Sequence, residues 1–410
     1  MIWDVIVVGA GASGMMAAGR AAMRGKHVLI VEKNARPGAK LSITGGGRCN
    51  VTNAEEDEQV LLAHYGAAKD FLHSPFSQFG VNETFEFFQS RGLGLVTQAR
   101  KRVFPVTERA EDVVRVMEAF CREGDVIIRT GVAVERINVL DGRISGVVVA
   151  GEVLTAHAYI LATGGLSHPE TGSTGDGFAW LAMLGHGVQE PTPTIVPLAV
   201  EDEWVKKLAG VTLSAVRVSV LLDGKRMFAL KGDVLCTHFG LSGPLILNSA
   251  GKVADLLHEG VVTLQIDAYP QEDVGALDRR ITAVFDANKN KFLKNIWNDI
   301  APLGTAHALL PLLKDINPQC QVNSVTRDQR RQIVDLLKSL PVTVTGLMGY
   351  DRAVVADGGL ALSDVDMRTM RSNKYDNLFV TGDLLHISRP SGGYSLQLCW
   401  TTGWVAGSHC

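Results

Sequence analysis

Three glycines near the start of the chain have the spacing of a phosphate-binding turn. Gly9, Gly11 and Gly14 follow the hydrophobic run 2–8, and Glu32 stands at the end of the next hydrophobic run. In such a turn the first glycine permits a tight bend, the second lets the backbone approach a pyrophosphate, and the third lets helix and strand pack closely. The N–H groups of the following helix favour an anion, and an acid placed like Glu32 accepts from a ribose hydroxyl. The pattern predicts a dinucleotide site.

Two further glycine turns end hydrophobic runs far along the chain. Residues 162–165 (ATGG) follow one run, and 381–383 (TGD) follow the run 378–380. Because the carboxyl ends of parallel strands meet at one edge of a sheet, we expect all three turns to converge there, which suits a long ligand such as FAD. Asp383 is expected to accept from a ribityl hydroxyl; the alternative is an aspartate that only forms the turn.

A glycine pair near the C-terminus precedes an uncharged, helix-like segment. Gly392 and Gly393 stand directly before residues 394–405. A helix that begins there presents free backbone N–H groups and the positive end of its dipole. These features suit the N1/O2 edge of a flavin, where the reduced ring carries negative charge.

The elements that would position these residues read as an α/β fold. Residues 2–8 and 27–31 resemble buried parallel strands around a helix at 13–24, and residues 40–53 are expected to form a glycine-rich loop. Near Pro191 the pattern changes to alternating residues typical of antiparallel strands, and from 271 to 340 it is helical, with a helix beginning near Thr326.

This pattern predicts a discontinuous Rossmann-like, FAD-binding domain at 1–190 and 341–410. An inserted domain at 191–340 interrupts it. The insert is expected to be mainly antiparallel β over 191–268 and mainly helical over 269–340.

Composition narrows the class of protein. Of 410 residues, 46% are hydrophobic and 20% charged, as in folded globular proteins, and the net charge of −3 lacks the basic excess that phosphate backbones require. We therefore expect a small-molecule substrate, with neither nucleic acid nor a membrane as partner. The first residues lack a charged leader, so we expect a cytoplasmic protein. The six cysteines form no CxxC pair, which argues against a disulfide framework or a zinc site, and we expect no metal.

Six segments together resemble the BaiN/RdsA-type (YhiN-like) family of NAD(P)/FAD-dependent oxidoreductases, which is related to the glutathione-reductase-like and fumarate-reductase-like flavoproteins. They are GAGASG at 9–14, KLSITGGGRCNVTN at 40–53, RVFP at 102–105, ATGGLSHPETGSTGDG at 162–177, THFGLSGPLIL at 237–247, and TGDLL with SGGYSLQLCWTTGWVAG within 381–407. The chain departs from the family pattern at His386 and 388–390, where the family has an acidic residue and a glycine.

The resemblance implies non-covalently bound FAD, with its ring over residues 44–50 and beside 391–394. The expected cofactor-binding residues are Gly9, Gly11, Ser13, Gly14, Glu32, Lys33, Lys40, Thr44, Gly45, Arg48, Asn50, Val134, Ala162, Thr163, Gly164, Gly382, Asp383, Gly392, Gly393 and Tyr394.

No catalytic residue can be assigned from the pattern, but two are candidates. Cys49 lies beside Arg48, which would favour a thiolate, whereas a lone buried cysteine is usually only a small apolar residue. His238, within the inserted domain, is a candidate proton donor or substrate-orienting group; the alternative is a hydrogen-bonded structural histidine that holds the insert against the flavin domain.

The leading functional hypothesis is an FAD-dependent oxidoreductase that transfers hydride between a small organic substrate and FAD, with the insert as the roof of the site. No second GxGxxG occurs in a strand–helix setting, so NAD(P)H would bind only transiently as a donor. A reductase and an amine or amino-acid oxidase that uses oxygen both remain open. The pattern also allows a flavin-loaded redox sensor or scaffold without turnover and an RNA-modifying flavoenzyme, although the acidic charge balance opposes the last.

Overall fold

The computed structural model describes residues 2–410. The chain divides into two compact units, the first made of residues up to Thr192 together with Val354–Cys410, and the second of Pro193–Ala353. The second unit is thus an insertion within the first.

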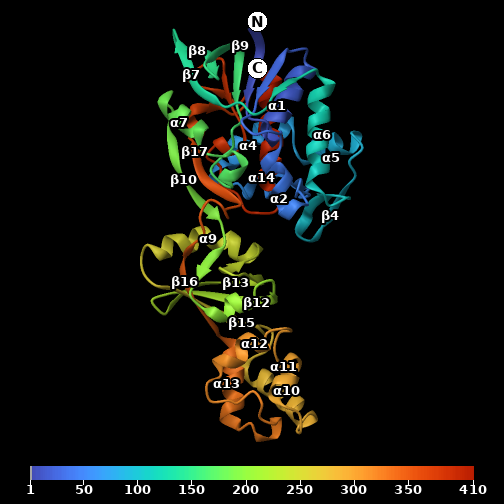
Figure 1. Cartoon of the computed structure of the whole chain (residues 1–410), viewed down its shortest axis with the longest axis vertical. Coiled ribbons are helices and arrows are strands. Elements are labelled where there is room, and N and C mark those ends of the chain that lie inside the picture. Colours follow the sequence, from blue (N-terminus) through green and yellow to red (C-terminus); the bar gives the residue numbers. More distant parts are fainter. Residues whose placement is uncertain (1) are drawn as a thin grey trace. The chain divides into compact units, whose positions relative to one another are not determined.

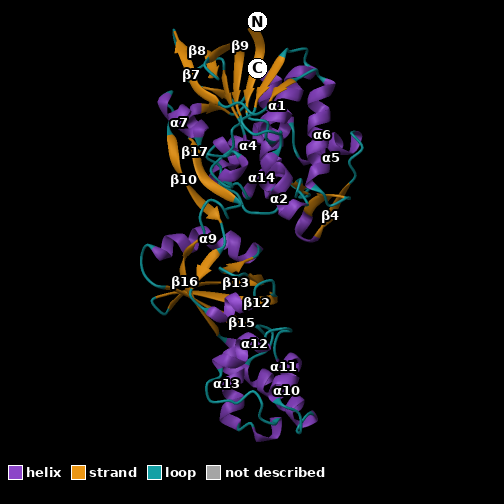
Figure 2. Cartoon of the chain, in the orientation of Figure 1, coloured by secondary structure: helices purple, strands orange, loops and turns teal. Residues whose placement is uncertain are grey.

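A mostly parallel sheet forms the centre of the first unit (Figures 1 and 2). The runs 2–8 and 28–31 become fully paired parallel strands because their residues are apolar on both faces and are covered on both sides. The strand order is β18 (Val365–Asp366), β19 (Arg371–Ser372), β20 (Leu378–Val380), β9 (Glu152–Leu161), β1 (Ile2–Val8), β2 (Val28–Val31) and β6 (Ile127–Arg129), with β8 (Arg143–Val149) joining β9 to β7 (Val134–Leu140).

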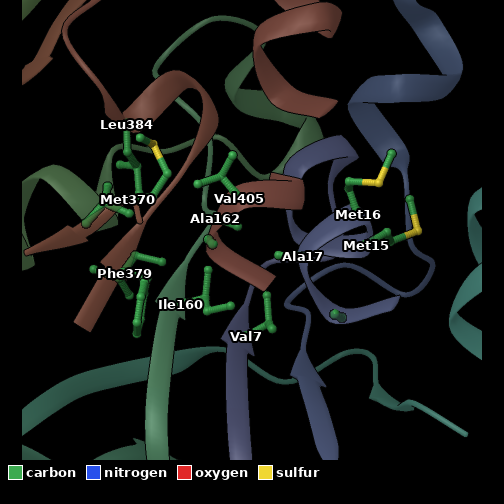
Figure 3. Packing of buried hydrophobic residues seen from close by; sticks show 14 of the residues in the cluster. Val7, Met15, Met16, Ala17, Ile160, Ala162, Met370, Phe379, Leu384 and Val405 are labelled. Carbon is green, nitrogen blue, oxygen red and sulfur yellow. The ribbon is translucent and has the colours of Figure 1, made fainter. Parts of the chain in front are cut away.

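Helices cover this sheet and carry the C-terminal segment back to the first helix. α1 (Ala12–Met23) packs along α14 (Tyr394–His409), and glycines permit the close approach: a Cβ on Gly403 would lie 2.5 Å from the Ser13 carbonyl oxygen. Figure 3 shows the core between them and the sheet, with Val7 and Ile160 from the strands, Met16 from α1 and Val405 from α14. The other helices of this unit are α2 (Ala39–Gly47), α3 (Glu58–Ala63), α4 (Lys69–Gln78), α5 (Val81–Ser90), α6 (Ala110–Glu123) and α7 (Asp176–Met183).

Two small sheets complete the first unit's strands. β3 (Thr52–Asn53), β5 (Arg102–Pro105) and β4 (Leu95–Gln98) form one of them. β10 (Val188–Ile195) pairs with β17 (Val355–Leu360) in the other, where the chain leaves the first unit and returns to it.

The expected loop at 40–53 is wrong in its first part, because residues 39–47 form α2. Ala39 to Ile43 are compatible with a helix and bury Leu41. The helix breaks only at Thr44, which is extended, and at Gly45 and Gly46, which are left-handed with φ of 59° and 68°. Glycine adopts that conformation at little cost, so the break falls at the glycine run.

The second unit is a closed antiparallel barrel with helices. The barrel order is β11 (Leu198–Val200), β14 (Gly240–Ser242), β13 (Lys225–Cys236), β12 (Thr212–Leu222), β15 (Val262–Asp267) and β16 (Leu340–Leu347). Its helices are α8 (Glu203–Lys207), α9 (Pro244–Leu257), α10 (Val274–Ala287), α11 (Leu293–Ile300), α12 (Ala306–Leu309) and α13 (Arg327–Lys338). The helix predicted to begin near Thr326 is α13, and the Thr326 hydroxyl caps it by accepting from the Gln329 N–H.

The return to the first unit falls later than the sequence pattern suggested. β16 pairs with β11 and β15, so it belongs to the barrel, and the division lies between Ala353 and Val354 rather than before residue 341. The strand-like pattern of 340–347 is the same whichever sheet it joins, and only the pairing partners distinguish the two units.

A buried histidine ties the end of α7 to the edge of the sheet. The ring of His186 is fully buried, with Nδ1 3.1 Å from Asp364 Oδ2 and Nε2 3.2 Å from Ser372 Oγ. Because an ionised carboxylate only accepts, Nδ1–H is the donor and Nε2 accepts from the serine. Ser372 Oγ itself accepts from the Lys374 and Tyr375 N–H groups and its side chain is buried, so this serine–histidine–aspartate series is structural.

We expect the stability of the first unit to fall as pH drops below about 6.5, the ordinary pKa of histidine. Burial lowers the pKa of His186, against the opposing effect of Asp364. The unfolded chain therefore takes up a proton that the folded chain does not, and the stabilisation present above that pH is lost. The thermal unfolding midpoint measured from pH 8 to 5 checks this, and His186→Gln is expected to flatten the curve; an equally steep curve in that variant would assign the effect to other groups.

Candidate functional site

The glycine turn between β1 and α1 combines tight packing with one open position. A Cβ on Gly14 would lie 2.0 Å from the Gly9 carbonyl oxygen, and one on Gly9 would lie 2.6 Å from the Ala162 carbonyl oxygen. Around Gly11, by contrast, no atom lies within 4 Å of the position a Cβ would take. Gly11 is also the N-cap of α1, and no side chain caps that end. The helix therefore presents backbone N–H groups beside open space, as an anion site requires.

Glu32 lies against this turn. Its Oε2 accepts from the Ala10 N–H at 2.7 Å, and its Oε1 accepts from the Asn34 N–H at 2.8 Å. A carboxylate has about four lone-pair sites, so Glu32 retains acceptor capacity for a hydroxyl. The N–H of Val132 donates to the Glu32 carbonyl, which brings the segment that leads to Val134 beside the same strand end. Lys33 instead pairs with Asp176 at 2.7 Å.

The ends of β9 and β20 meet the same edge of the sheet. A Cβ on Gly165 would lie 3.5 Å from the Asp383 Cβ, so the two residues are neighbours. A Cβ on Gly382 would lie 2.8 Å from Oγ of Ser13 in α1. The Cβ position on Gly164 is 3.9 Å from Lys40 Nζ. Figure 3 shows Ala162, just after β9, beside Ala17 and Val405. The expected convergence of the three turns is therefore observed.

One buried polar atom at this edge has no partner within the chain. The Thr163 hydroxyl, directly after β9, is buried and makes no hydrogen bond among the described residues. A buried hydroxyl normally has a partner, so an orphan beside an open glycine turn fits a polar ligand.

The turn after α2 is built by the residues expected to face the flavin ring. Thr44 accepts from the Cys49 N–H at 2.9 Å, and the Cβ position on Gly45 is 3.1 Å from the Asn50 nitrogen. Asn50 Oδ1 accepts from the Val103 N–H at 3.2 Å, which anchors the turn to β5. Arg48 makes its own contacts outside the turn: it pairs with Glu108, donates to Gln98 at 2.9 Å and stacks on Phe104.

The glycine pair before α14 packs directly on β3. Gly392 and Gly393 have φ of 129° and 101°, and a Cβ on Gly393 would lie 2.2 Å from the Thr52 carbonyl carbon. No side chain caps α14, whose first residue is Tyr394. The buried Tyr65 hydroxyl donates to the Tyr394 carbonyl at 2.9 Å. The helix that was predicted at 394–405 is thus present, with a free N-terminus.

The structure adds residues that the sequence analysis missed. Arg389 is buried and bonded to Asp383, and Gln397 is buried within α14 and bonded to residues of two other segments, β3 and the start of α5. A signal for Arg389 existed, because it is the single Lys, Arg, Asp or Glu after Asp383. Nothing in the sequence around Gln397 marks its partners, since they are distant in the chain.

The two catalytic candidates have different surroundings. Cys49 is completely buried with φ of 59°, and burial raises the pKa of its thiol to about 12. The thiol therefore stays protonated at neutral pH, which favours the structural alternative. His238 lies exposed in the turn between β13 and β14, in the second unit, with its ring 4.8 Å from that of Phe239. Its role as a proton donor stays a prediction.

We expect Cys49→Ala to leave FAD binding and turnover unchanged. A buried thiol with a raised pKa exposes almost no thiolate, so alkylation of Cys49 in the native protein at pH 8 is expected to be at least ~100-fold slower than that of free cysteine. Peptide mapping after iodoacetamide treatment measures this rate for each cysteine. Rapid labelling, or loss of turnover in the variant, would return Cys49 to the catalytic candidates.

Residues 2–410 contain no group of three or more His, Cys, Asp or Glu side chains that could hold a metal ion. No helix in that range is long and apolar enough to cross a membrane.

The whole-chain comparison decides the family. The model described as the HI0933-like protein Rossmann domain matches residues 3–409. The chain belongs to the HI0933-like family. The chain is 31% identical over 405 residues to a 3-dehydro-bile acid delta(4,6)-reductase from Clostridium scindens, and the alignment covers 98% of this chain and 97% of the relative. It is 27% identical over 411 residues to a ribosomal RNA dihydrouridine synthase from Escherichia coli, with 98% and 96% covered.

A solved structure of similar fold supports the architecture. The 3-ketosteroid-delta4-(5alpha)-dehydrogenase from Rhodococcus jostii RHA1, in complex with 4-androstene-3,17-dione, superposes with a TM-score of 0.53 at 15% identity and covers 100% of this chain and 95% of that chain. This confirms the predicted Rossmann-type FAD-binding fold. The family and the reductase among its relatives support the expected class, a flavin-dependent oxidoreductase.

Proposed function

We propose that this protein is a reductase that adds hydrogen to a carbon–carbon double bond conjugated to a carbonyl group in a small organic substrate. The observation that carries the redox site is the convergence of three glycine turns and the uncapped N-terminus of α14 in the first unit. The type of reaction follows from the relatives, because a delta(4,6)-reductase of a 3-dehydro-bile acid and a dihydrouridine synthase both saturate such a bond.

The residues present fit FAD. The open face at Gly11 and the N–H groups of α1 would hold the pyrophosphate, and Glu32 would accept from the adenosine ribose. Asp383 would accept from the ribityl chain, and the N–H groups of α14 would face the polar edge of the ring. When bound, FAD supplies hydride exchange at N5, while the protein supplies orientation and charge.

Residues of the chain also exclude water from the back of this site. Tyr65 is fully buried against the first turn of α14, where it donates to the Tyr394 carbonyl, and the fully buried Trp400 donates to the Val51 carbonyl. Gln397 joins α14 to β3 and α5. A low-dielectric surrounding strengthens each charge–dipole interaction at the site.

The decisive experiment follows the flavin spectrum of the purified protein without oxygen. We expect the visible band of oxidised flavin to bleach with NADPH, NADH or a photochemical reductant, and to return when a 3-oxo steroid with conjugated double bonds is added. The steroid is expected to gain two hydrogens by mass. Bleaching by amines or amino acids, with recovery only in air, would replace the reductase by an oxidase. Bleaching of the flavin band by NADPH or NADH tests separately whether a nicotinamide cofactor donates the electrons.

A second candidate is reduction of uridine in RNA, since a full-length relative at 27% identity carries that activity in its name. The net charge of −3 opposes it. In the same assay, recovery of the flavin band with a uridine-containing ribosomal RNA fragment, and none with the steroid, would select this candidate.

A further inference from the structure

Arg389 is a buried cation held on every side. Its side chain is 2% exposed. Nε donates to Ser395 Oγ at 3.0 Å, Nη1 donates to the Ile387 carbonyl at 2.6 Å, and Nη2 donates to Asp383. Because all three nitrogens have acceptors within the chain, the guanidinium is fixed in one position and is not free to bind a substrate carboxylate.

A buried cation requires a counter-charge, and the side chain that supplies it, Asp383, also interacts with Lys40. A buried charge is costly unless it is paired, and Asp383 is the partner of Arg389. Lys40 is a second cation close enough to interact with both Asp383 and Arg389, and burial lowers its pKa. Its Nζ donates to Ser167 Oγ at 3.2 Å. The group thus contains Arg389, Lys40 and Asp383, and Glu170 is also close enough to interact with Lys40.

The first turn of α14 adds positive potential to the same group. Ser395, which accepts from Arg389, lies in that turn, and no acidic residue or side-chain cap neutralises the N-terminus. The positive end of a helix dipole is equivalent to roughly half an elementary charge. Arg389 thus connects the strand-end carboxylate to the helix N-terminus.

This group lies at the edge where the glycine turns converge. Asp383 is beside Gly165, and Lys40 Nζ is 3.9 Å from the Cβ position on Gly164. Arg389 and the N-terminus of α14 therefore lie near the edge of the sheet to which FAD is assigned.

We propose that Arg389 is a positioning residue that holds Asp383 in one orientation, and that its charge raises the reduction potential of the bound flavin. This inference rests on the proposed function insofar as it requires FAD at the glycine turns. The physical reason is that two-electron reduction adds negative charge to the ring system, and a fixed cation in a low-dielectric surrounding favours the more negative form.

The test is the midpoint potential of the FAD-loaded protein, measured without oxygen against a reference dye. In Arg389→Gln we expect the ratio of reduced to oxidised flavin at a given potential to fall about tenfold, which corresponds to about 30 mV for a two-electron couple. Arg389→Lys is expected to retain most of the wild-type potential because it keeps the charge. Asp383→Asn is expected to shift the potential the other way.

A matched control separates charge at the site from loss of a structural arginine. Arg91 lies in the same unit, pairs with Glu123 and stacks on Phe87 and Phe120, and Arg91→Gln is expected to leave the potential unchanged. An unchanged potential in Arg389→Gln, or an equal fall in Arg389→Lys, overturns the proposal. If Arg389→Gln does not retain FAD, the Asp383→Asn variant provides the test. A midpoint potential in that variant equal to or below the wild-type value overturns the proposal.

The measurement also separates this inference from the proposed function. It needs no substrate, so failure to reduce any conjugated carbonyl compound would contradict the reductase and leave the effect of Arg389 standing. Failure of the wild-type protein to bind FAD would overturn both.

Discussion

Gly11→Ala is expected to weaken FAD binding strongly while the protein still folds. Gly11 has φ of −81°, which alanine adopts readily, and its Cβ would meet no atom of the chain within 4 Å. The added methyl group would instead occupy the space that the pyrophosphate needs. We expect FAD affinity to fall at least ~100-fold, about 2.7 kcal/mol, in equilibrium dialysis against the apoprotein.

Two other glycines serve as controls for this result. Gly14→Ala places a methyl group 2.0 Å from the Gly9 carbonyl oxygen, so it is expected to destabilise the fold itself, whether or not FAD is present. Gly251 lies within α9 of the second unit with no atom near its Cβ position, and Gly251→Ala is expected to stabilise that helix by about 1 kcal/mol without affecting FAD. Normal FAD affinity in Gly11→Ala would mean that the cofactor does not approach this turn.

Gln397→Leu is expected to produce the largest loss of stability among these variants that add no backbone clash. The Gln397 side chain is fully buried; its amide oxygen accepts from Thr52 Oγ1 at 2.6 Å, and its amide nitrogen donates to the Gly80 carbonyl and to Thr401 Oγ1, each at 3.1 Å. Leucine has similar volume but leaves buried polar partners unsatisfied, at a cost of about 3 kcal/mol. Thermal unfolding and hydrogen exchange of the α14 amides measure the loss.

A surface glutamine provides the control for that substitution. Gln89 is exposed on α5, and Gln89→Ala is expected to change stability by less than ~0.5 kcal/mol. Since Gln397 holds α14 against β3, Gln397→Leu is also expected to weaken FAD binding. An unfolding midpoint equal to that of Gln89→Ala would show that the buried network contributes no net stability.

Much of the candidate cofactor site was predictable from local sequence. The glycine turn at Gly9, Gly11 and Gly14, the acid at Glu32 and the glycine pair before α14 are contiguous patterns whose steric requirements are the same in any protein. Glycine allows positive φ and close backbone approach wherever it stands, so its spacing alone indicates the turn. The same holds for the apolar runs that became β1 and β2, and for the Thr326 cap of α13.

Other expectations failed because they depended on neighbours outside the local segment. Residues 39–43 form a helix because Leu41 has a core to bury against, and β16 belongs to the barrel because β11 and β15 lie beside it. For Cys49, where a thiolate beside Arg48 and a buried apolar residue were both open, burial raises the pKa of the thiol and favours the second alternative, and the sequence does not display that burial.

Residue types at short spacing were enough to predict the family, the α/β class and the glycine turns. Packing brought together polar groups that lie far apart in the chain: Asp383 meets Arg389, Lys40 lies near both, and Gln397 bonds to β3 and to the start of α5. The physical reason is that electrostatic and hydrogen-bond energies depend on distance and burial in space. Residues far apart in the chain reach those distances only after the sheet and α14 have packed.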